Sequence, residues 1–274
     1  MKGKRLKKFK TSIMSAEYDS HTKKRVLPPW MKLCETATKE GQDESQFKKS
    51  RETRIQEAAG SFDKILNDSL REMHFSGSLI YSHHKSDCNL LCEELNTTLT
   101  DVDGPSFVGF DMEWPVSYRP GRQEKTAVLQ LCTSADKCYI FHLSCIGGIP
   151  PVLGQLLSSP RVRKVGVGIQ SDFWKLERDY GLSVAPILKS CVVDLSLYAN
   201  QVLGSKETWS LDGLVKHLFQ RKINKNPIVR KSDWSEFPLT DIQKSYAATD
   251  AYVSYLIYEK LNKMDGNSGK SNKD

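Results

Sequence analysis

The chain has 274 residues and a formal net charge of +7. Residues 1–75 hold 17 Lys and Arg against 11 Asp and Glu, a balance of +6, which leaves +1 for residues 76–274. This length suits one domain of about 200 residues with an appendage. We expect no membrane span and no signal peptide, since the apolar runs are short and the N-terminus is basic. The seven cysteines are odd in number and form no Cys-x-x-Cys pair, which indicates a reducing compartment without a zinc site.

The N-terminal segment 1–74 is predicted to be basic and largely disordered, with a possible helix at 46–73 and an apolar island at 27–31. Such an arm suits nuclear import or phosphate contacts, and we expect the nucleus as the location. A solvated tail without a partner stays equally open. The composition of 264–274 also predicts disorder, so the folded domain is expected to span residues 75–263.

Strands and helices alternate along this domain. A short strand is expected at 78–82 and a helix at 87–99. Strands at 106–114, 126–132 and 138–143 are close enough in sequence to form an antiparallel meander. Further strands are expected at 164–169 and 191–195, with helices at 152–158, from residue 171 or 172 to about 180, and at 195–203, 210–220 and 240–263. The sum is an α/β fold, a mixed five-stranded sheet flanked by helices.

The strand at 106–114 ends with two acids, Asp111 and Glu113. Residues two apart in a strand project from the same face, while Phe110 and Met112 point the other way. Two carboxylates held this close repel, and a bound cation relieves the repulsion. The alternative is an exposed strand end with two solvated acids.

The last predicted helix places Tyr246 and Asp250 one turn apart on the same face. The small residues Ala247, Ala248 and Ala251 favour close packing of this helix on the sheet. Asp250 then faces inward, where a carboxylate needs a partner or a metal. An ordinary Tyr–Asp hydrogen bond is the simpler alternative.

Asp172 follows the strand at 164–169, where α/β sheets commonly place functional groups. A plain helix N-cap explains this aspartate equally simply. Trp174 lies two residues further on and suits either base stacking or core packing.

Together these motifs resemble the three exonuclease motifs of the DEDD superfamily. Residues 76–262 resemble the Werner-type exonuclease domains of its ribonuclease D group. The resemblance rests on blocks at 108–115, 165–169, 172–176, 207–211, 233–240 and 246–252. It implies a ribonuclease H-like (DnaQ-like) fold, with Asp111, Glu113, Asp172 and Asp250 as the acidic set. Tyr246 indicates the DEDDy branch, because Ser245 stands where the other branch has histidine.

The resemblance implies a metal-dependent 3′–5′ exonuclease that hydrolyses DNA to nucleoside 5′-monophosphates in repair or replication. Two Mg²⁺ ions about 3.5–4 Å apart are expected, with Mn²⁺ as a substitute. Asp111 is the expected bridging ligand. Glu113 and Asp250 complete the site of the first ion and Asp172 lies nearer the second. Tyr246 is expected to orient the attacking water.

Nucleic-acid contacts are expected from Trp174 and Lys175, with Arg122, Lys125, Arg230 and Lys231 as weaker candidates. Two other functions stay open, an exoribonuclease of the ribonuclease D type and a non-catalytic nucleic-acid-binding module. No helicase segment follows the domain in this sequence, so a stand-alone protein and a fragment both remain possible.

Overall fold

The strand with the acidic pair, β3 (Ser106–Glu113), is an inner strand of a six-stranded sheet in the computed structural model. The structure describes residues 68–101, 104–117, 121 and 123–268. The strands lie in the order β2–β5–β4–β3–β6–β7. The other five are β2 (Ser78–Ser82), β4 (Val128–Ser134), β5 (Lys137–Phe141), β6 (Val162–Gly166) and β7 (Val192–Asp194).

The pairing of the strands confirms the mixed sheet and the meander. Strands β3, β4 and β5 pair antiparallel, whereas β6 and β7 extend the sheet in parallel beyond β3. The sheet has six strands rather than five, because β2 pairs in parallel with β5 and forms the opposite edge. The sequence predicts β2 as a strand, but nothing local shows which strand it joins.

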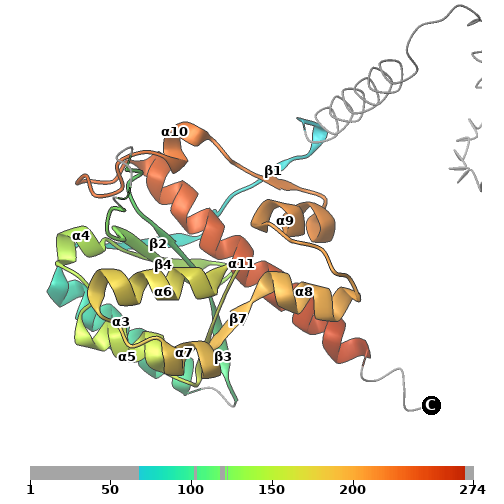
Figure 1. Ribbon diagram of the computed structural model, residues 1–274, viewed down its shortest axis with the longest axis horizontal. Helices are drawn as coiled ribbons and strands as arrows, with labels where there is room; N and C mark the ends of the chain where they lie inside the picture. The colour runs from blue at the N-terminus through green and yellow to red at the C-terminus, as the bar shows by residue number, and fades with distance from the viewer. Residues whose placement is uncertain (1–67, 102–103, 118–120, 122, 269–274) are drawn as a thin grey trace, which may run out of the picture. The chain divides into compact units, whose positions relative to one another are not determined.

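Helices cover both faces of the sheet (Figure 1). Phe110 and Met112 of β3 share one buried core with helices from the first face. These helices are α3 (Lys85–Thr100), α5 (Pro151–Ser158), α6 (Ile169–Tyr180) and α7 (Ala185–Ser190). The long helix α11 (Asp241–Ser268) packs along β3, β4 and β5 on the other face. The alternation predicted for β3 therefore puts its acids toward α11.

Close contact between α11 and β3 depends on Gly109. A Cβ atom at this position would lie 2.0 Å from the carbonyl oxygen of Ala251 and 2.7 Å from the backbone nitrogen of Tyr255. Ala247, Ala248 and Ala251 are fully buried at this contact, as the sequence predicts. Small residues on both elements thus bring the helix backbone onto the strand two residues before Asp111.

The remaining helices α8 (Leu195–Leu203) and α9 (Leu211–Phe219) agree with their predicted ranges. Five short elements were not predicted, because two to six residues carry too little of a period to read. They are α4 (Leu143–Ile146), the helix α7 given above, α10 (Pro227–Arg230), and β1 (Glu72–Met73) paired in parallel with β8 (Lys222–Ile223).

Two predicted boundaries differ most from the structure. Strand β6 ends at Gly166 and α6 begins at Ile169, because Gly168 turns the chain with φ +69°. Helix α11 runs to Ser268, so the first residues of the predicted tail are helical. The domain limits at 75 and 263 remain a proposal, and the arm at 1–67 lies outside the described residues, with most of its possible helix.

Most of the cysteines that the structure describes are buried free thiols. Cys132, Cys138 and Cys191 are buried, and no disulfide joins cysteines in the described part of the chain. Among the helices that the structure describes, none is both long and apolar enough to cross a membrane.

Candidate active site

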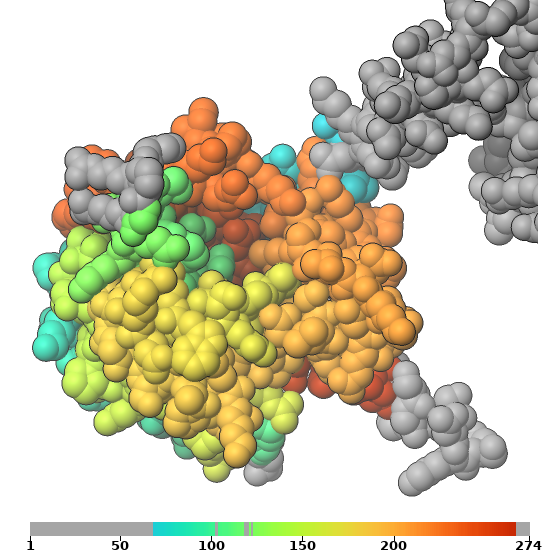
Figure 2. All heavy atoms as spheres, in the orientation of Figure 1, coloured from blue at the N-terminus to red at the C-terminus, as the bar shows by residue number. Residues whose placement is uncertain are grey.

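Three predicted site residues converge where β3 ends beside α11. Asp111 and Glu113 come from β3, and Asp250 comes from the third turn of α11. One carboxylate oxygen from each lies within 4.8 Å of the other two. Asp250 is buried and the other two are partly buried, so the exposed strand end considered above is wrong. The space-filling view shows a hollow between α6 (yellow) and the orange segment of α8 to α10 (Figure 2).

Asp172 approaches this cluster from the first turn of α6. It does not cap the helix, because the N-cap residue is Gly168 and no side chain caps the helix there. Instead, the backbone N–H of Gly168 donates to Asp194 Oδ2 at 3.0 Å. Asp194 also caps α8 by accepting from Ser196 N–H at 2.9 Å. The carboxylate of Asp172 is thus free of a capping role.

Burial raises the pKa values of all four carboxyl groups, and repulsion from neighbouring site acids adds to the shifts of Asp111, Glu113 and Asp172. Burial and then the nearby Asp250 hold the pKa of Asp111 well above its usual range. Burial, Asp111, Asp250 and Asp172 raise the pKa of Glu113 likewise, and Arg230 opposes this shift. Burial and then Asp111 raise the pKa of Asp172 to about 8. Without a bound cation these carboxyl groups therefore tend to retain protons at neutral pH, because the protein does not balance their charge.

Tyr246 lies one turn before Asp250, and its hydroxyl group lowers the pKa of that carboxyl group, against the effect of burial. Burial is the larger effect and raises the pKa of Asp250 to about 7. Burial and then the charge of Asp250 raise the pKa of the Tyr246 hydroxyl. The tyrosine therefore stays protonated and can donate a hydrogen bond at neutral pH.

The donor set fits a divalent metal. Asp111, Glu113, Asp172 and Asp250 offer only carboxylate oxygens, the ligands that Mg²⁺ and Mn²⁺ prefer. A bound cation would stabilise the ionised form of these carboxyl groups, which burial and the repulsion among Asp111, Glu113 and Asp172 disfavour. No sulfur or imidazole joins the cluster found among the described residues, which argues against a zinc site here.

Comparison with known proteins identifies the family. A family described as 3′-5′ exonuclease matches residues 84–264. The chain belongs to this 3′–5′ exonuclease family. It is 41% identical over 240 residues to the mouse protein "Bifunctional 3'-5' exonuclease/ATP-dependent helicase WRN", covering 88% of this chain and 16% of that protein. It is 30% identical to a "3'-5' exonuclease" of Drosophila grimshawi, covering 91% of this chain and 77% of that one.

Solved structures share the fold of this exonuclease. The catalytic core of RRP6 from Trypanosoma brucei has a TM-score of 0.56 at 22% identity, covering 73% of this chain and 51% of that one. RNase D from Escherichia coli has a TM-score of 0.55 at 20% identity, covering 71% and 46%. These structures confirm the ribonuclease H-like fold. The family and the acidic cluster make the chain a phosphodiester hydrolase that depends on a divalent metal.

The two residues predicted to contact the nucleic-acid strand, Trp174 and Lys175, lie in different environments. Trp174 is 49% exposed on α6, two residues after Asp172, and remains a candidate for base stacking. Lys175 is buried, and its Nζ lies 2.8 Å from Asp179 Oδ2 and donates to the Glu124 carbonyl at 2.7 Å. Its ammonium group also lies 4.8 Å from the ring centre of Trp114. These contacts give Lys175 a structural role, and its binding to nucleic acid stays a prediction.

The weaker candidates for nucleic-acid contacts differ in their distance from the site. Arg230 is exposed, and its charge lowers the pKa values of Glu113 and Tyr246, so it lies near the site. Lys231 is exposed beside it, Lys125 lies 5.6 Å from the ring centre of Tyr180, and Arg122 is outside the described residues. The sequence reasoning missed Gln130, which directly faces Asp111 across β3 and β4. The β4 pattern could have revealed it as a polar residue at a buried position.

Proposed function

We propose that this enzyme hydrolyses DNA from the 3′ end and releases nucleoside 5′-monophosphates in genome maintenance. The observation that carries the proposal is the convergence of Asp111, Glu113 and Asp250 beside Tyr246. Identity of 41% to a protein described as a bifunctional 3′-5′ exonuclease and ATP-dependent helicase supports the exonuclease activity, and the Werner-type motif blocks favour DNA as the substrate. The chain covers only 16% of that relative, so no helicase activity is proposed.

The four carboxylates would hold two Mg²⁺ ions, with Mn²⁺ as a substitute. Asp111 would be shared, Glu113 and Asp250 would complete one position and Asp172 the other. When bound, such ions generate a nucleophile from water and stabilise charge on the leaving 3′ oxygen. The Tyr246 hydroxyl is a protonated donor one helical turn from Asp250 and would hold the attacking water in line. The buried β3 and α11 backbones keep these groups in fixed positions.

RNA is the second candidate substrate. Escherichia coli RNase D is described as "an exoribonuclease involved in structured RNA processing" and shares the fold. At 20% identity this likeness shows the fold alone, so it motivates a test of RNA and no more. A third candidate is a nucleic-acid-binding module without catalysis, for which salt-sensitive binding would survive chelation.

A nuclease assay with a labelled recessed DNA duplex and a structured RNA 3′ end tests these candidates. The proposal expects stepwise release of 5′-mononucleotides from DNA with Mg²⁺, and loss of release with EDTA or Asp111→Ala. Faster release from RNA would reverse the order of substrates. Binding without any release by the wild-type protein would leave only the non-catalytic module.

We also propose a nuclear location, since Lys2, Lys4, Arg5, Lys7 and Lys8 form a basic cluster in the first ten residues. A fluorescent fusion of the full chain should enter the nucleus. Replacement of these five residues by glutamine should leave it outside. Equal distribution of both fusions would contradict the proposal.

A further inference from the structure

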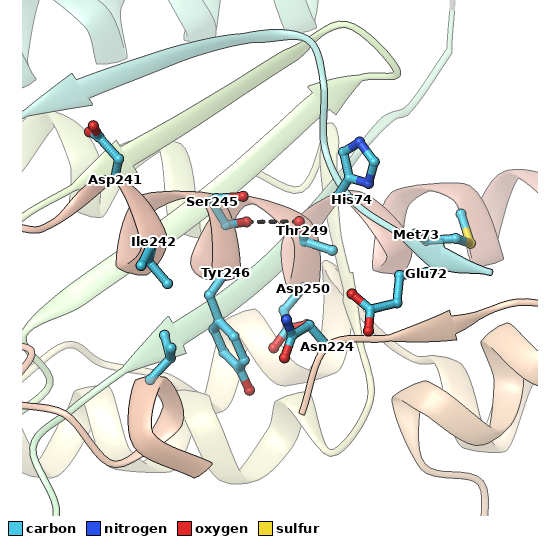
Figure 3. A pocket seen from close by; sticks show the side chains of 11 residues that line it. Glu72, Met73, His74, Asn224, Asp241, Ile242, Ser245, Tyr246, Thr249 and Asp250 are labelled. Atoms are coloured by element: carbon cyan, nitrogen blue, oxygen red, sulfur yellow. Dashed lines mark hydrogen bonds between the residues drawn. The ribbon is translucent and has the colours of Figure 1, made fainter. Parts of the chain in front are cut away.

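A pocket next to the candidate active site has no assigned role. Its volume is about 320 Å³, and one wall is a single face of α11. That wall consists of Asp241, Ile242, Ser245, Tyr246, Thr249 and Asp250. Figure 3 shows the side chains of Tyr246 and Asp250 pointing to the same side of α11. The pocket therefore continues along α11 from its first turn to residues of the candidate site.

The facing wall comes from two segments that are distant in sequence. Glu72 and Met73 of β1 and the following His74 supply one part. Asn224 follows β8, and Val229 belongs to α10. The parallel pair of β1 and β8 holds these segments together, with Met73 directly opposite Ile223. The pocket is thus built by tertiary structure rather than by one loop.

The chemistry of the lining excludes phosphate and suits a neutral ring. The eleven lining residues include three acids and one histidine, and no lysine or arginine. A phosphate group would meet negative charge there without a cationic partner. Met73, Val229, Ile242 and the Tyr246 ring offer apolar contact, while the amide of Asn224 can donate and accept hydrogen bonds. A nucleobase has this combination of apolar faces and polar edges.

Positive charge lies in the chain segment that forms the second wall. Residues 213–232 contain six Lys and Arg and no Asp or Glu. Lys225, Arg230 and Lys231 are exposed within this stretch, and Asn224 and Val229 are their direct neighbours in sequence. Arg230 has no ion pair with a residue that the structure describes. Phosphates next to a base in the pocket would find cations on this segment.

We propose that the pocket between α11, β1 and the β8–α10 segment binds a nucleobase of the substrate strand near its 3′ end. The inference rests on the proposed nuclease function and adds a base-binding position separate from Trp174, which does not line this pocket. Occupation of the pocket holds the strand against Tyr246 and Asp250. It makes recognition of the terminal nucleotides dependent on a base as well as on phosphates.

An abasic scan tests the position of the base. Single-stranded oligonucleotides carry one abasic nucleotide at each of the last four positions in turn. Their dissociation constants are measured by fluorescence anisotropy with Ca²⁺ in place of Mg²⁺, and hydrolysis is measured separately with Mg²⁺. The wild-type protein should bind about tenfold more weakly when the abasic nucleotide stands at one particular position, in addition to the position whose base stacks on Trp174.

The variant Ser245→Trp fills the pocket from an exposed position on α11. It should bind the intact oligonucleotide about tenfold more weakly and should show no further loss at the position identified above. The matched control is Ser86→Trp, an exposed helical serine of α3 that does not line the pocket. This control should keep the wild-type abasic profile, and both variants should keep the wild-type melting temperature.

Two results would overturn the inference. One is an abasic profile in which Trp174→Ala removes every position-specific loss. The other is a Ser245→Trp protein that retains the full wild-type profile. Failure of the nuclease proposal is a separate result. It would appear as absence of Mg²⁺-dependent hydrolysis, whereas the base-binding inference is judged from the affinities measured in Ca²⁺.

Discussion

Gln130 of β4 lies directly opposite Asp111 of β3, on the face that α11 covers. Its side chain is fully buried, and neither amide atom has a hydrogen-bond partner among the described residues. An unpaired buried amide costs about 1–3 kcal/mol, so its presence beside an acidic site calls for a partner in another state of the site. When a bound cation balances the charge of Asp111, its carboxylate is the neighbouring group that can accept a hydrogen bond from the Gln130 amide.

We therefore predict that Gln130→Leu raises the stability of the metal-free protein by about 1 kcal/mol, because it removes two unpaired polar groups. The same change should reduce the rise in melting temperature that Mn²⁺ causes in the wild type. Thermal unfolding with EDTA and with a Mn²⁺ titration measures both effects. Equal Mn²⁺ responses of the two proteins would show that Gln130 does not support the metal site.

The pH dependence of the unfolding free energy should reveal the raised pKa of Asp172. Its pKa of about 8 exceeds the usual 3.8, so the native protein retains a proton that the unfolded chain releases. The stabilisation by this proton is complete below pH 4 and is lost as pH rises toward 8. The free energy of unfolding of the wild type, minus that of Asp172→Asn, should fall with pH by up to about 1.4 kcal/mol per unit.

Urea unfolding in EDTA at several pH values between about 4 and 8 measures this difference. Subtraction of the Asp172→Asn values removes the contributions of groups that titrate in both proteins, including His142, whose pKa burial lowers. Saturating Mg²⁺ should flatten the pH dependence. A difference that rises with pH in EDTA would contradict the raised pKa.

Gly109→Ala should separate α11 from β3. The new methyl group would lie 2.0 Å from the Ala251 carbonyl oxygen, so the helix that carries Asp250 must move. We expect a loss of about 3 kcal/mol in unfolding free energy and a loss of nuclease activity greater than the loss of folded protein.

The matched control is Gly154→Ala in α5, where the nearest atoms would be 3.8 Å and 3.9 Å away. That control should be stabilised by about 0.5–1 kcal/mol, because alanine favours the helix. Wild-type activity in folded Gly109→Ala protein would show that the site tolerates displacement of α11.

Neighbouring residues on α6 provide a paired test of the strand contacts. Trp174→Ala should leave stability within about 0.5 kcal/mol, because the side chain is exposed, and should weaken single-strand binding by about tenfold. Lys175→Met should instead lower the unfolding free energy by about 3 kcal/mol, since it removes the buried cation of Asp179 and leaves only the more exposed Arg178 beside that carboxylate. Urea unfolding and fluorescence anisotropy on both variants distinguish the two roles. A stable Lys175→Met protein with weak DNA binding would show that Lys175 contacts the nucleic-acid strand.

The sequence by itself determined that Asp111 and Glu113 share a face and that Tyr246 and Asp250 lie one turn apart. These relations follow from the period of a strand and of a helix, which backbone sterics impose locally. Motif order also identified the family and the fold, and the alanines of α11 predicted its close packing.

Only the tertiary structure decided which of these groups meet and which candidates also have structural partners. Asp172 is free of a capping role because Gly168 turns the chain before it, and Lys175 is buried because Asp179 and the Glu124 carbonyl bind it. The pocket beside Asp250 joins Glu72 to Asn224 across about 150 residues of chain. Such contacts depend on packing between segments that are distant in sequence. Local sequence patterns do not predict them, because the free energy of burial depends on all the elements that together exclude water.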